Sequence, residues 1–323
     1  MSEGEFEFIA HRLRPLAAGA PGALDLLDDA ALLDPAVGTQ LVLTKDAMVA
    51  GVHFLEDDPA GEIAQKLLRV NLSDLAAMGA APIGYLLALV RPKAIEDDWL
   101  GAFCAGLAAD NAEFGISVLG GDTVSTPGPL TLSLTAIGQL PKGTALLRSG
   151  ARADDDIWVS GTLGDAALGL AVLQGALDAA GPARAHLIER YRVPRPRLAL
   201  GQALRNLAHA AIDISDGLVA DLGHVLEASG VGAEVRTDLL PLSEATAGLP
   251  GAEEAVLSGG DDYELAFTAA RERRKELEAL SRELDVPLAR IGVVQSGQPR
   301  LAIVDSAGKP MSYKGAYDHF GGR

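Results

Sequence analysis

Hydrophobic positions in the first half of the chain recur at intervals typical of amphipathic helices and buried strands. Leu130, Leu132 and Leu134 alternate as in a strand with one buried face. The pattern predicts helices at residues 5–16, 59–78 and 95–114, and strands at 41–43, 83–90, 116–119 and 130–137. Gly115 is placed to end the third helix.

The second half repeats this order of strands and helices. It predicts strands at residues 157–159, 211–214, 231–236, 263–267, 288–294 and 301–304, and helices at 166–177, 197–207, 218–228 and 270–284. Pro141, Gly143 and Gly150 indicate a linker at 140–150, so we expect two domains, residues 1–142 and 143–323. Alternating strands and helices predict α/β or α+β domains.

Composition and charge narrow the class of protein. Of the 323 residues, 48% are hydrophobic and 22% charged, which is typical of globular proteins. The net charge of −17 argues against binding to nucleic acid or to an anionic membrane surface, since both need clustered Lys and Arg. An acidic protein can still bind anionic ligands when metal cations lie between the two negative charges.

The sequence has a single cysteine and shows no targeting or membrane-spanning segment. The single cysteine, Cys104, rules out an internal disulfide and a thiolate-rich zinc site. The acidic N-terminal stretch lacks the basic region and apolar core of a signal peptide. The most apolar stretch, residues 75–90, is interrupted by Gly79, Pro82 and Gly84 and is shorter than the ~20 residues of a spanning helix. We therefore expect a cytoplasmic protein.

Many carboxylates fall at the ends of apolar runs, beside glycine or other small residues. They are Asp28, Asp29, Asp46, Asp74, Asp122, Asp213, Asp216, Asp261 and Asp262. Hard divalent cations take oxygen ligands, and Mg²⁺ typically uses a few carboxylates together with substrate phosphates. The set therefore predicts a site for several Mg²⁺ ions, although each Asp taken singly is also compatible with a helix cap or a turn.

Two stretches are more distinctive than the rest. Asp74 lies in a helical pattern among apolar residues, where a buried carboxylate needs a partner such as a metal ion. The stretch Asp213-Ile214-Ser215-Asp216-Gly217 joins a predicted strand to a helix, so Ser215 or Asp216 is expected to cap that helix, whose N-terminus favours anions.

Other candidate residues have equally good structural explanations. His53, between apolar neighbours, suits either a ligand contact or a half-buried histidine with its own partner. Arg148 suits either a phosphate clamp or a surface charge.

The sequence lacks the common nucleotide-binding and catalytic motifs. The P-loop, the Gly-rich dinucleotide motif, the nucleophile elbow and the kinase catalytic loop are all absent.

Taken together, these segments resemble the thiamine-monophosphate kinase family. That family shares an ATP-binding superfamily with aminoimidazole ribonucleotide synthetase, selenophosphate synthetase and a hydrogenase-maturation protein. The resemblance covers nearly the whole chain and includes Gly4-Glu5-Phe6, Ser160-Gly161-Thr162-Leu163-Gly164-Asp165, Ser258-Gly259-Gly260-Asp261-Asp262-Tyr263-Glu264-Leu265 and Tyr317-Asp318-His319-Phe320. Each motif alone is moderately specific to the superfamily, whereas the ordered set with the C-terminal motif is specific to the kinase.

The resemblance implies transfer of the ATP γ-phosphate to thiamine monophosphate, giving thiamine diphosphate and ADP. It implies an N-terminal mixed sheet that packs with helices and forms a homodimer, and a C-terminal α/β sandwich that completes the ATP and substrate site. By motif matching, the Mg²⁺ ligands would be Asp29, Thr44, Asp46, Asp74, Asp122, Asp213 and Asp216. ATP would contact Gly121, Asp122, Arg148 and Ser215, and the thiamine phosphate would contact His53, Asp261 and Tyr317.

The sequence departs from the family pattern in three places. Leu26 and Leu27 stand where a Gly-rich approach to the first Asp pair is usual, which changes the turn. Lys45 stands where a small hydroxyl residue is usual, and its side chain could point away, contact a phosphate or displace a cation. Asp261 stands where some members have Glu, which shortens the reach to substrate.

The chemistry of the two substrates agrees with a metal-rich site. Donor and acceptor are both anions, and several Mg²⁺ ions would offset their repulsion and orient them. The second pKa of a phosphate monoester is about 6, so the acceptor is mostly deprotonated at neutral pH and direct in-line transfer needs no general base. The alternatives are another enzyme of the superfamily, such as an aminoimidazole ribonucleotide synthetase, or a non-catalytic acidic metal- or nucleotide-binding protein.

Overall fold

The computed structural model of the chain describes residues 4–311 and divides into two compact units. The first unit comprises Met1–Leu75 and Ala80–Gly143, and the second comprises Ala76–Gly79 and Thr144–Arg323. Each unit has a sheet of its own, and the two sheets differ in size and strand order.

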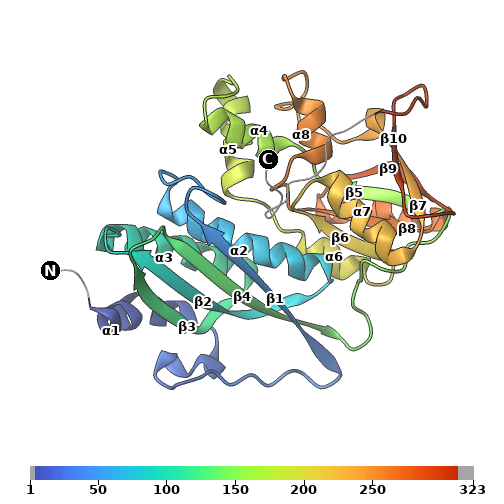
Figure 1. The fold of residues 1–323 in the computed structure, drawn as a ribbon. Coiled ribbons are helices and arrows are strands. Elements are labelled where there is room, and N and C mark those ends of the chain that lie inside the picture. The colour runs from blue at the N-terminus through green and yellow to red at the C-terminus, as the bar shows by residue number, and fades with distance from the viewer. Residues whose placement is uncertain (1–3, 312–323) are drawn as a thin grey trace. The chain divides into compact units, whose positions relative to one another are not determined.

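The first unit is built on a four-stranded mixed sheet in the order β1-β4-β2-β3. Strands β2 and β3 are parallel, and the other neighbours are antiparallel. The strands are β1 (Thr39–Val49), β2 (Ala81–Pro92), β3 (Ser117–Thr126) and β4 (Thr131–Pro141). Helices α2 (Ala60–Ala77) and α3 (Asp97–Phe114) lie along one face of the sheet (Figure 1).

The chain before β1 is helical in short pieces. It forms α1 (Glu5–Phe8), a π-helix (Ile9–Leu13) and two 3₁₀ helices (Arg14–Ala17 and Pro21–Leu26). The predicted helix at residues 5–16 is therefore confirmed as helical chain, but not as one continuous α-helix. Pro15 is the second residue after the π-helix, and a proline has no backbone N–H to extend the hydrogen-bond ladder.

The hydrophobic alternation of β4 decides which face of the first sheet is covered. Leu132 and Leu134 are fully buried, and cross-strand partners share their face. The opposite face leaves three large apolar side chains exposed, Leu43 on β1 (63%), Leu86 on β2 (40%) and Val124 on β3 (43%). One face of this sheet is therefore packed against helices, and the other, called the open face below, keeps part of its apolar surface exposed.

A buried ion pair joins the two long helices of the first unit. Arg69 of α2 donates to both carboxylate oxygens of Asp110 on α3 at 2.8 Å, and to Glu113 at 2.7 Å. The guanidinium also lies over the Phe114 ring, 5.1 Å from its centroid. Gly115 ends α3 in the left-handed conformation (φ 64°), as the sequence predicts.

The second unit holds a six-stranded sheet in the order β10-β7-β9-β5-β8-β6, in which only the β10–β7 pair is parallel. The strands are β5 (Asp156–Ser160), β6 (Ala208–Ile214), β7 (Gly232–Arg236), β8 (Glu264–Ala269), β9 (Leu288–Gln295) and β10 (Leu301–Val304). Every residue of β5 and β8 is buried, which makes them the centre of this core.

Helices cover both faces of the second sheet. Helices α7 (Leu218–Ser229) and α8 (Ala252–Ser258) belong to one apolar cluster, and α6 (Leu198–Leu204) and α9 (Arg274–Leu284) to another. Helices α4 (Asp165–Leu173) and α5 (Gly181–Arg192) pack together with α8 in a third cluster. The expected α/β sandwich is confirmed for this unit, and the expected mixed sheet with helices is confirmed for the first.

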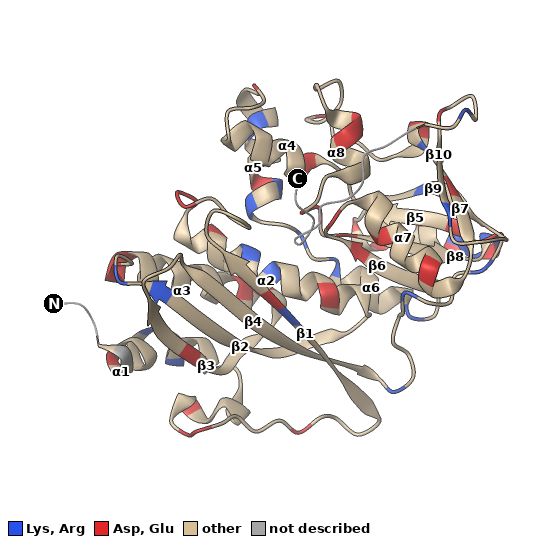
Figure 2. Ribbon diagram, viewed as in Figure 1, with Lys and Arg blue, Asp and Glu red and all other residues tan. Residues whose placement is uncertain are grey.

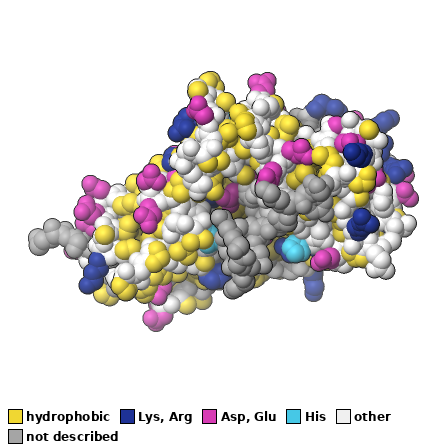
Figure 3. Space-filling view, turned by 45° about the horizontal axis from the view of Figure 1, so that its top comes forward, with side chains coloured by type: hydrophobic (Ala, Val, Ile, Leu, Met, Phe, Trp, Pro, Cys, Tyr) yellow, Lys and Arg dark blue, Asp and Glu magenta, His cyan; other side chains and the backbone are white. Residues whose placement is uncertain are grey.

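Charged residues of both signs are distributed over both units. Asp and Glu positions are spread over the helices and loops of both units (Figure 2). On the face drawn in Figure 3, Lys and Arg side chains are interspersed with Asp and Glu. Within residues 4–311, no helix is both long and apolar enough to cross a membrane.

Candidate active site

A polar cluster lies between β1 and α2 in the first unit. The Thr44 hydroxyl donates a hydrogen bond to Asp74 Oδ2, and the Asp46 amide donates to Asn71 Oδ1 at 3.1 Å. Thr44 and Asp46 lie on the helix-covered face of β1, opposite buried positions of β4. All these side chains are half-buried or buried, so their oxygens are concentrated at the margin of the core.

The two carboxylates of this cluster repel each other. The pKa of Asp46 is raised to about 6, mainly by burial and then by the charge of Asp74, against a lowering by Lys45. A divalent cation removes such repulsion and prefers hard oxygen ligands. The Thr44, Asp46 and Asp74 oxygens therefore fit Mg²⁺.

Lys45 points away from this cluster. Strand alternation places it on the open face of the sheet, where Nζ donates to Ser133 Oγ on β4 at 2.6 Å. The Ser133 hydroxyl in turn donates to the carbonyl oxygen of Asp46 at 3.0 Å. Of the three orientations open from the sequence, the structure shows the one that leaves the Thr44 and Asp46 side chains accessible to a cation.

His53 lies in the turn that follows β1. Its Nδ1 accepts a hydrogen bond from the Val49 amide at 3.1 Å, and its carbonyl oxygen accepts one from Lys66 Nζ at 3.2 Å. With Nδ1 acting as an acceptor, the neutral ring carries its proton on Nε2. The half-buried ring is thus held in one orientation by the backbone of its own turn.

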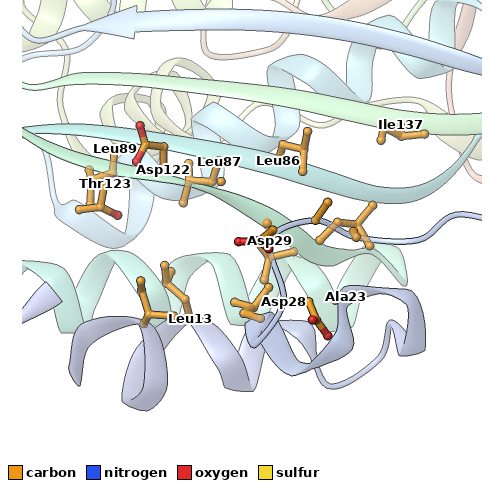
Figure 4. Close-up of a pocket in the computed structure, with 18 of the residues that line it drawn as sticks. Leu13, Ala23, Asp28, Asp29, Leu86, Leu87, Leu89, Asp122, Thr123 and Ile137 are labelled. Atoms are coloured by element: carbon orange, nitrogen blue, oxygen red, sulfur yellow. The ribbon is translucent and has the colours of Figure 1, made fainter. Parts of the chain in front are cut away.

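A cavity of about 520 Å³ in the first unit brings Asp28, Asp29 and Asp122 to one space. Asp28 and Asp29 come from the segment before β1, and Asp122 from β3 (Figure 4). Gly121, beside Asp122, is required by space as well as by its φ of 156°, because a Cβ there would lie 1.8 Å from the Leu87 carbonyl oxygen.

The approach to Asp28 and Asp29 is strained. Leu24, Asp25 and Leu26 all have positive φ, at 52°, 56° and 55°, which L-residues rarely adopt. The Leu27 side chain that follows is 69% exposed. The departure from a glycine-rich sequence is therefore met by three consecutive residues in the left-handed region.

In the second unit, the turn between β6 and α7 carries Asp213, Ser215 and Asp216. Asp213 is buried at the end of β6, and Asp216 is exposed. The prediction that Ser215 or Asp216 caps α7 is wrong, because Gly217 (φ 109°) is the N-cap residue and no side chain caps the helix. Instead, Asp221 Oδ2, within the first helical turns, accepts the amides of Ser215 and Asp216, each at 3.0 Å.

A second turn carries Asp261 and is bonded to the first through the backbone. The Asp261 amide donates to the Ser215 carbonyl at 2.9 Å, and the Tyr263 amide to the Ile214 carbonyl at 2.7 Å. Asp261 and Tyr263 have positive φ (69° and 50°), and the Tyr263 hydroxyl donates to Asp261 Oδ1 at 3.2 Å.

Three buried carboxylates anchor the surroundings of this second turn. Asp262 accepts the Gly164 amide on both oxygens, at 3.0 and 2.8 Å, and burial raises its pKa well above the ordinary range. Glu264 binds Arg190 and Arg197, and Asp165 at the start of α4 accepts hydrogen bonds from surrounding hydroxyls.

The remaining predicted residues are less constrained. Arg148 is exposed in the segment before β5, and its carbonyl oxygen accepts a hydrogen bond from Ser229 at 3.3 Å. Its charge lowers the pKa of Asp221, though burial has the largest effect there and raises that pKa to about 7. Tyr317 lies outside the described residues.

The predicted magnesium ligands of the first unit lie on both faces of its sheet. The strand register places Asp122 on the face opposite Thr44 and Asp46, and Asp213 and Asp216 belong to the second unit. Among the residues that the structure describes, no three His, Cys, Asp or Glu side chains form a group that could hold a metal ion. Mg²⁺ in proteins commonly completes its coordination with water and substrate phosphates.

Sequence reasoning missed the supporting carboxylates. Asp221 stands in the first turns of a helix, where an acidic residue is common for electrostatic reasons alone. Asp262 was among the candidate carboxylates, but its bonds to the Gly164 amide were not foreseen, and neither was the acceptance of the Asp46 amide by the side chain of Asn71. The signal that could have indicated Asp221 is its place a few residues after a predicted turn. From there its side chain can reach the amides of Ser215 and Asp216.

Comparison with known proteins gives one consistent answer. Residues 27–140 match the family model "AIR synthase related protein, N-terminal domain", and residues 152–304 match the corresponding C-terminal domain. Thiamine-monophosphate kinase of Salmonella typhimurium is 44% identical over 327 residues, covering 99% of each chain.

Two solved structures agree with these sequence matches. The crystal structure of thiamine-monophosphate kinase from Stenotrophomonas maltophilia K279a has a TM-score of 0.86 and 46% identity, covering 96% of this chain and 99% of that one. A structure of AaThiL complexed with AMPPCP and TMP has a TM-score of 0.77 and 30% identity, covering 98% of this chain and 97% of that one.

Proposed function

The chain belongs to the AIR synthase related family and groups there with the thiamine-monophosphate kinases; we propose on this basis that it transfers the γ-phosphate of ATP to thiamine monophosphate, giving thiamine diphosphate and ADP. The observation that carries the proposal is the full-length match to such kinases in a chain that also holds the oxygen-rich cluster of Thr44, Asp46 and Asp74.

Magnesium is part of this proposal. Thr44, Asp46 and Asp74 would hold one ion. Asp29 and Asp122 in the first unit, and Asp213 and Asp216 in the second, would be ligands of further Mg²⁺ ions. The bound ions would supply charge neutralisation between two phosphate groups that otherwise repel each other. The raised pKa of Asp46 supports the assignment, because burial and a neighbouring carboxylate make an ionised Asp costly there without a cation.

The chain's own residues would bind and orient the two substrates. Gly121 and Ser215 would present backbone to the nucleotide, Arg148 would contact its phosphates by charge, and Asp122 would contact it through a bound Mg²⁺ ion. His53, Asp261 and Tyr317 would contact the thiamine phosphate. Two observations support these roles: the His53 ring is held in one orientation, and the Asp261 backbone is hydrogen-bonded to the Ser215 turn. Positioning of this kind contributes much of the rate in phosphoryl transfer.

Transfer is proposed to be direct and in line, with no general base. The acceptor phosphate, with a second pKa of about 6, is mostly deprotonated at neutral pH. A chirally labelled γ-phosphorus tests this step. Inversion of configuration is expected for a single displacement, and retention would indicate a phosphoenzyme.

A homodimer formed through the first sheet is also proposed. Its support is the open sheet face with the exposed Leu43, Leu86 and Val124 side chains, an apolar surface of the kind that a second copy covers. Because ATP is the co-substrate, we propose the cytoplasm as the place of action.

Phosphorus NMR of the purified protein with ATP, Mg²⁺ and thiamine monophosphate tests the reaction. Thiamine diphosphate is expected from the monophosphate and not from thiamine, and only with Mg²⁺. Asp46→Asn is expected to raise the Mg²⁺ requirement, whereas the matched control Asp34→Asn, at an exposed loop position, is expected to leave it unchanged. Intact substrates despite ATP binding would direct attention to another acceptor.

A further inference from the structure

Asp221 lies just behind the turn that carries Ser215 and Asp216. Its side chain stands in the first turns of α7 and is only 3% exposed. A single oxygen, Oδ2, accepts the backbone amides of Ser215 and Asp216, each at 3.0 Å. A carboxylate that accepts two consecutive amides fixes the peptide planes between them, because both donors must point at one atom.

This arrangement explains why a buried acid is retained at the position. Burial of a carboxylate is unfavourable unless hydrogen bonds satisfy it, and the negative charge of Asp216 nearby adds to the penalty. The hydrogen bonds from the two backbone amides offset that penalty. A residue that only filled space at this point of α7 would carry neither the charge nor the hydrogen bonds.

The effect of Asp221 extends to the second turn. The Ser215 carbonyl accepts the Asp261 amide at 2.9 Å, and a Cβ on Gly260 would lie 2.5 Å from that same oxygen. The two turns are therefore in close backbone contact, and rotation of the Ser215 peptide would displace Asp261, which is already held at a φ of 69°.

We propose that Asp221 is a positioning residue, which orients the Ser215–Asp216 turn and, through it, the Asp261 turn, without itself contacting substrate. The inference rests on the proposed kinase function only for its catalytic readout. The role needs a hydrogen-bond acceptor rather than a negative charge, because both donors are neutral amides.

Three variants separate positioning from other roles. Asp221→Ala removes the acceptor, and Asp221→Asn keeps an oxygen that can accept both amides. Glu227→Ala removes an exposed carboxylate from the same helix and serves as the matched control. Each is measured by amide hydrogen exchange at Ser215, Asp216 and the α7 backbone, by kcat and KM for thiamine monophosphate, and by Mn²⁺ binding in the absence of nucleotide.

The expected result for Asp221→Ala is faster exchange confined to Ser215 and Asp216, weaker Mn²⁺ binding, and a fall in kcat of about 10²-fold, the size of effect that a misplaced group produces. Asp221→Asn and Glu227→Ala are expected to stay close to the wild type in all three measurements. If the alanine variant does not fold, Asp221→Asn alone decides, because retained protection and kcat support an acceptor role.

Three outcomes would overturn the proposal. One is Asp221→Ala with protected turn amides and normal kcat. Another is loss of protection along the whole of α7, which would indicate a general structural role. The third is Asp221→Asn with protected amides but lost activity, which would indicate that the charge itself acts on a ligand. If the wild type makes no thiamine diphosphate, the kinase proposal fails, and the exchange data still test the positioning role.

Discussion

Glu264 is the charged residue whose removal should destabilise the second unit most. Its side chain is fully buried at the start of β8 and accepts two hydrogen bonds from Arg197 at 2.6 Å, one from Arg190 at 3.0 Å and one from Ser160 at 2.6 Å. The Arg190 and Arg197 side chains are themselves only 5% and 17% exposed. The carboxylate thus neutralises two guanidinium groups that water reaches poorly.

Glu264→Gln keeps the volume of the side chain and removes this neutralisation. Breaking a buried ion pair by removing one partner typically costs about 3–5 kcal/mol, because the other charge stays buried. Set against a total unfolding free energy of about 5–15 kcal/mol, this is a large fraction. Arginine stays protonated at neutral pH in proteins, so both guanidinium groups keep their charge in the variant.

Urea unfolding followed by tryptophan fluorescence measures this loss. Trp158 of β5 lies parallel to Phe267 of β8, 6.5 Å between ring centroids, and so reports on the core that Glu264 adjoins. A Trp99→Phe background removes the only other tryptophan, which lies in the first unit. Glu253→Gln, at an exposed position of α8, is the matched control.

A second variant distinguishes the loss of charge neutralisation from a simple loss of packing. Replacing Arg190 and Arg197 by Met together with Glu264→Leu removes all three charges, and should recover much of the stability lost in Glu264→Gln. A Glu264→Gln variant within about 1 kcal/mol of the wild type would refute the argument, since that is no more than an ordinary hydrogen bond contributes.

Three further predictions concern other parts of the chain. Burial alone would raise the pKa of Asp165, but hydrogen bonds from Ser243, Thr162 and Thr246, together with the charge of His186, bring it below 3.8. The stability that Asp165 contributes is therefore present above pH 3.8 and lost as the pH falls through the folded-state value, so urea unfolding should show the deficit of Asp165→Ala at pH 7 shrinking in acid. Lys45→Ala should leave Mg²⁺ activation of the kinase reaction unchanged, because the side chain bonds Ser133 on the other face of β1; a changed Mg²⁺ requirement would contradict this orientation. Leu43→Lys should convert the proposed dimer to monomer in analytical ultracentrifugation, and an unchanged mass would exclude the open sheet face as the interface.

The sequence predicts most elements whose hydrophobic pattern is strong. Strand β10 has the predicted bounds, α2 and α7 differ by a residue or so, and the alternation of Leu130, Leu132 and Leu134 matches their burial. Helices α5 and α8 were missed for physical reasons. Helix α5 is rich in Arg, Glu and His and buries few apolar side chains, and α8 spans only 7 residues between Gly251 and Gly259.

The sequence singles out the candidate site residues but misplaces the strands that carry some of them. The strand prediction ended at residue 43, because Thr44, Lys45 and Asp46 read as the start of a loop, whereas β1 continues to Val49. Likewise Asp122 lies within β3, whose two glycines interrupt the apolar run. Edge strands tolerate such residues because one side of their backbone faces water, so polarity alone misplaces the strand end.

The carboxylates of this chain divide by what already occupies their oxygens. Asp165, Asp221 and Asp262 are buried and accept hydrogen bonds from backbone amides or hydroxyls, so those oxygens are occupied within the fold. Asp46 and Asp74 are half-buried beside one another, and the pKa of Asp46 is raised first by burial and then by the neighbouring charge of Asp74. Ligands for cations are expected among the second kind, because a cation relieves the repulsion between neighbouring carboxylates. Asp221 lies outside the ligand set because its Oδ2 already accepts the amides of Ser215 and Asp216, and that is why its amide variant should keep its function.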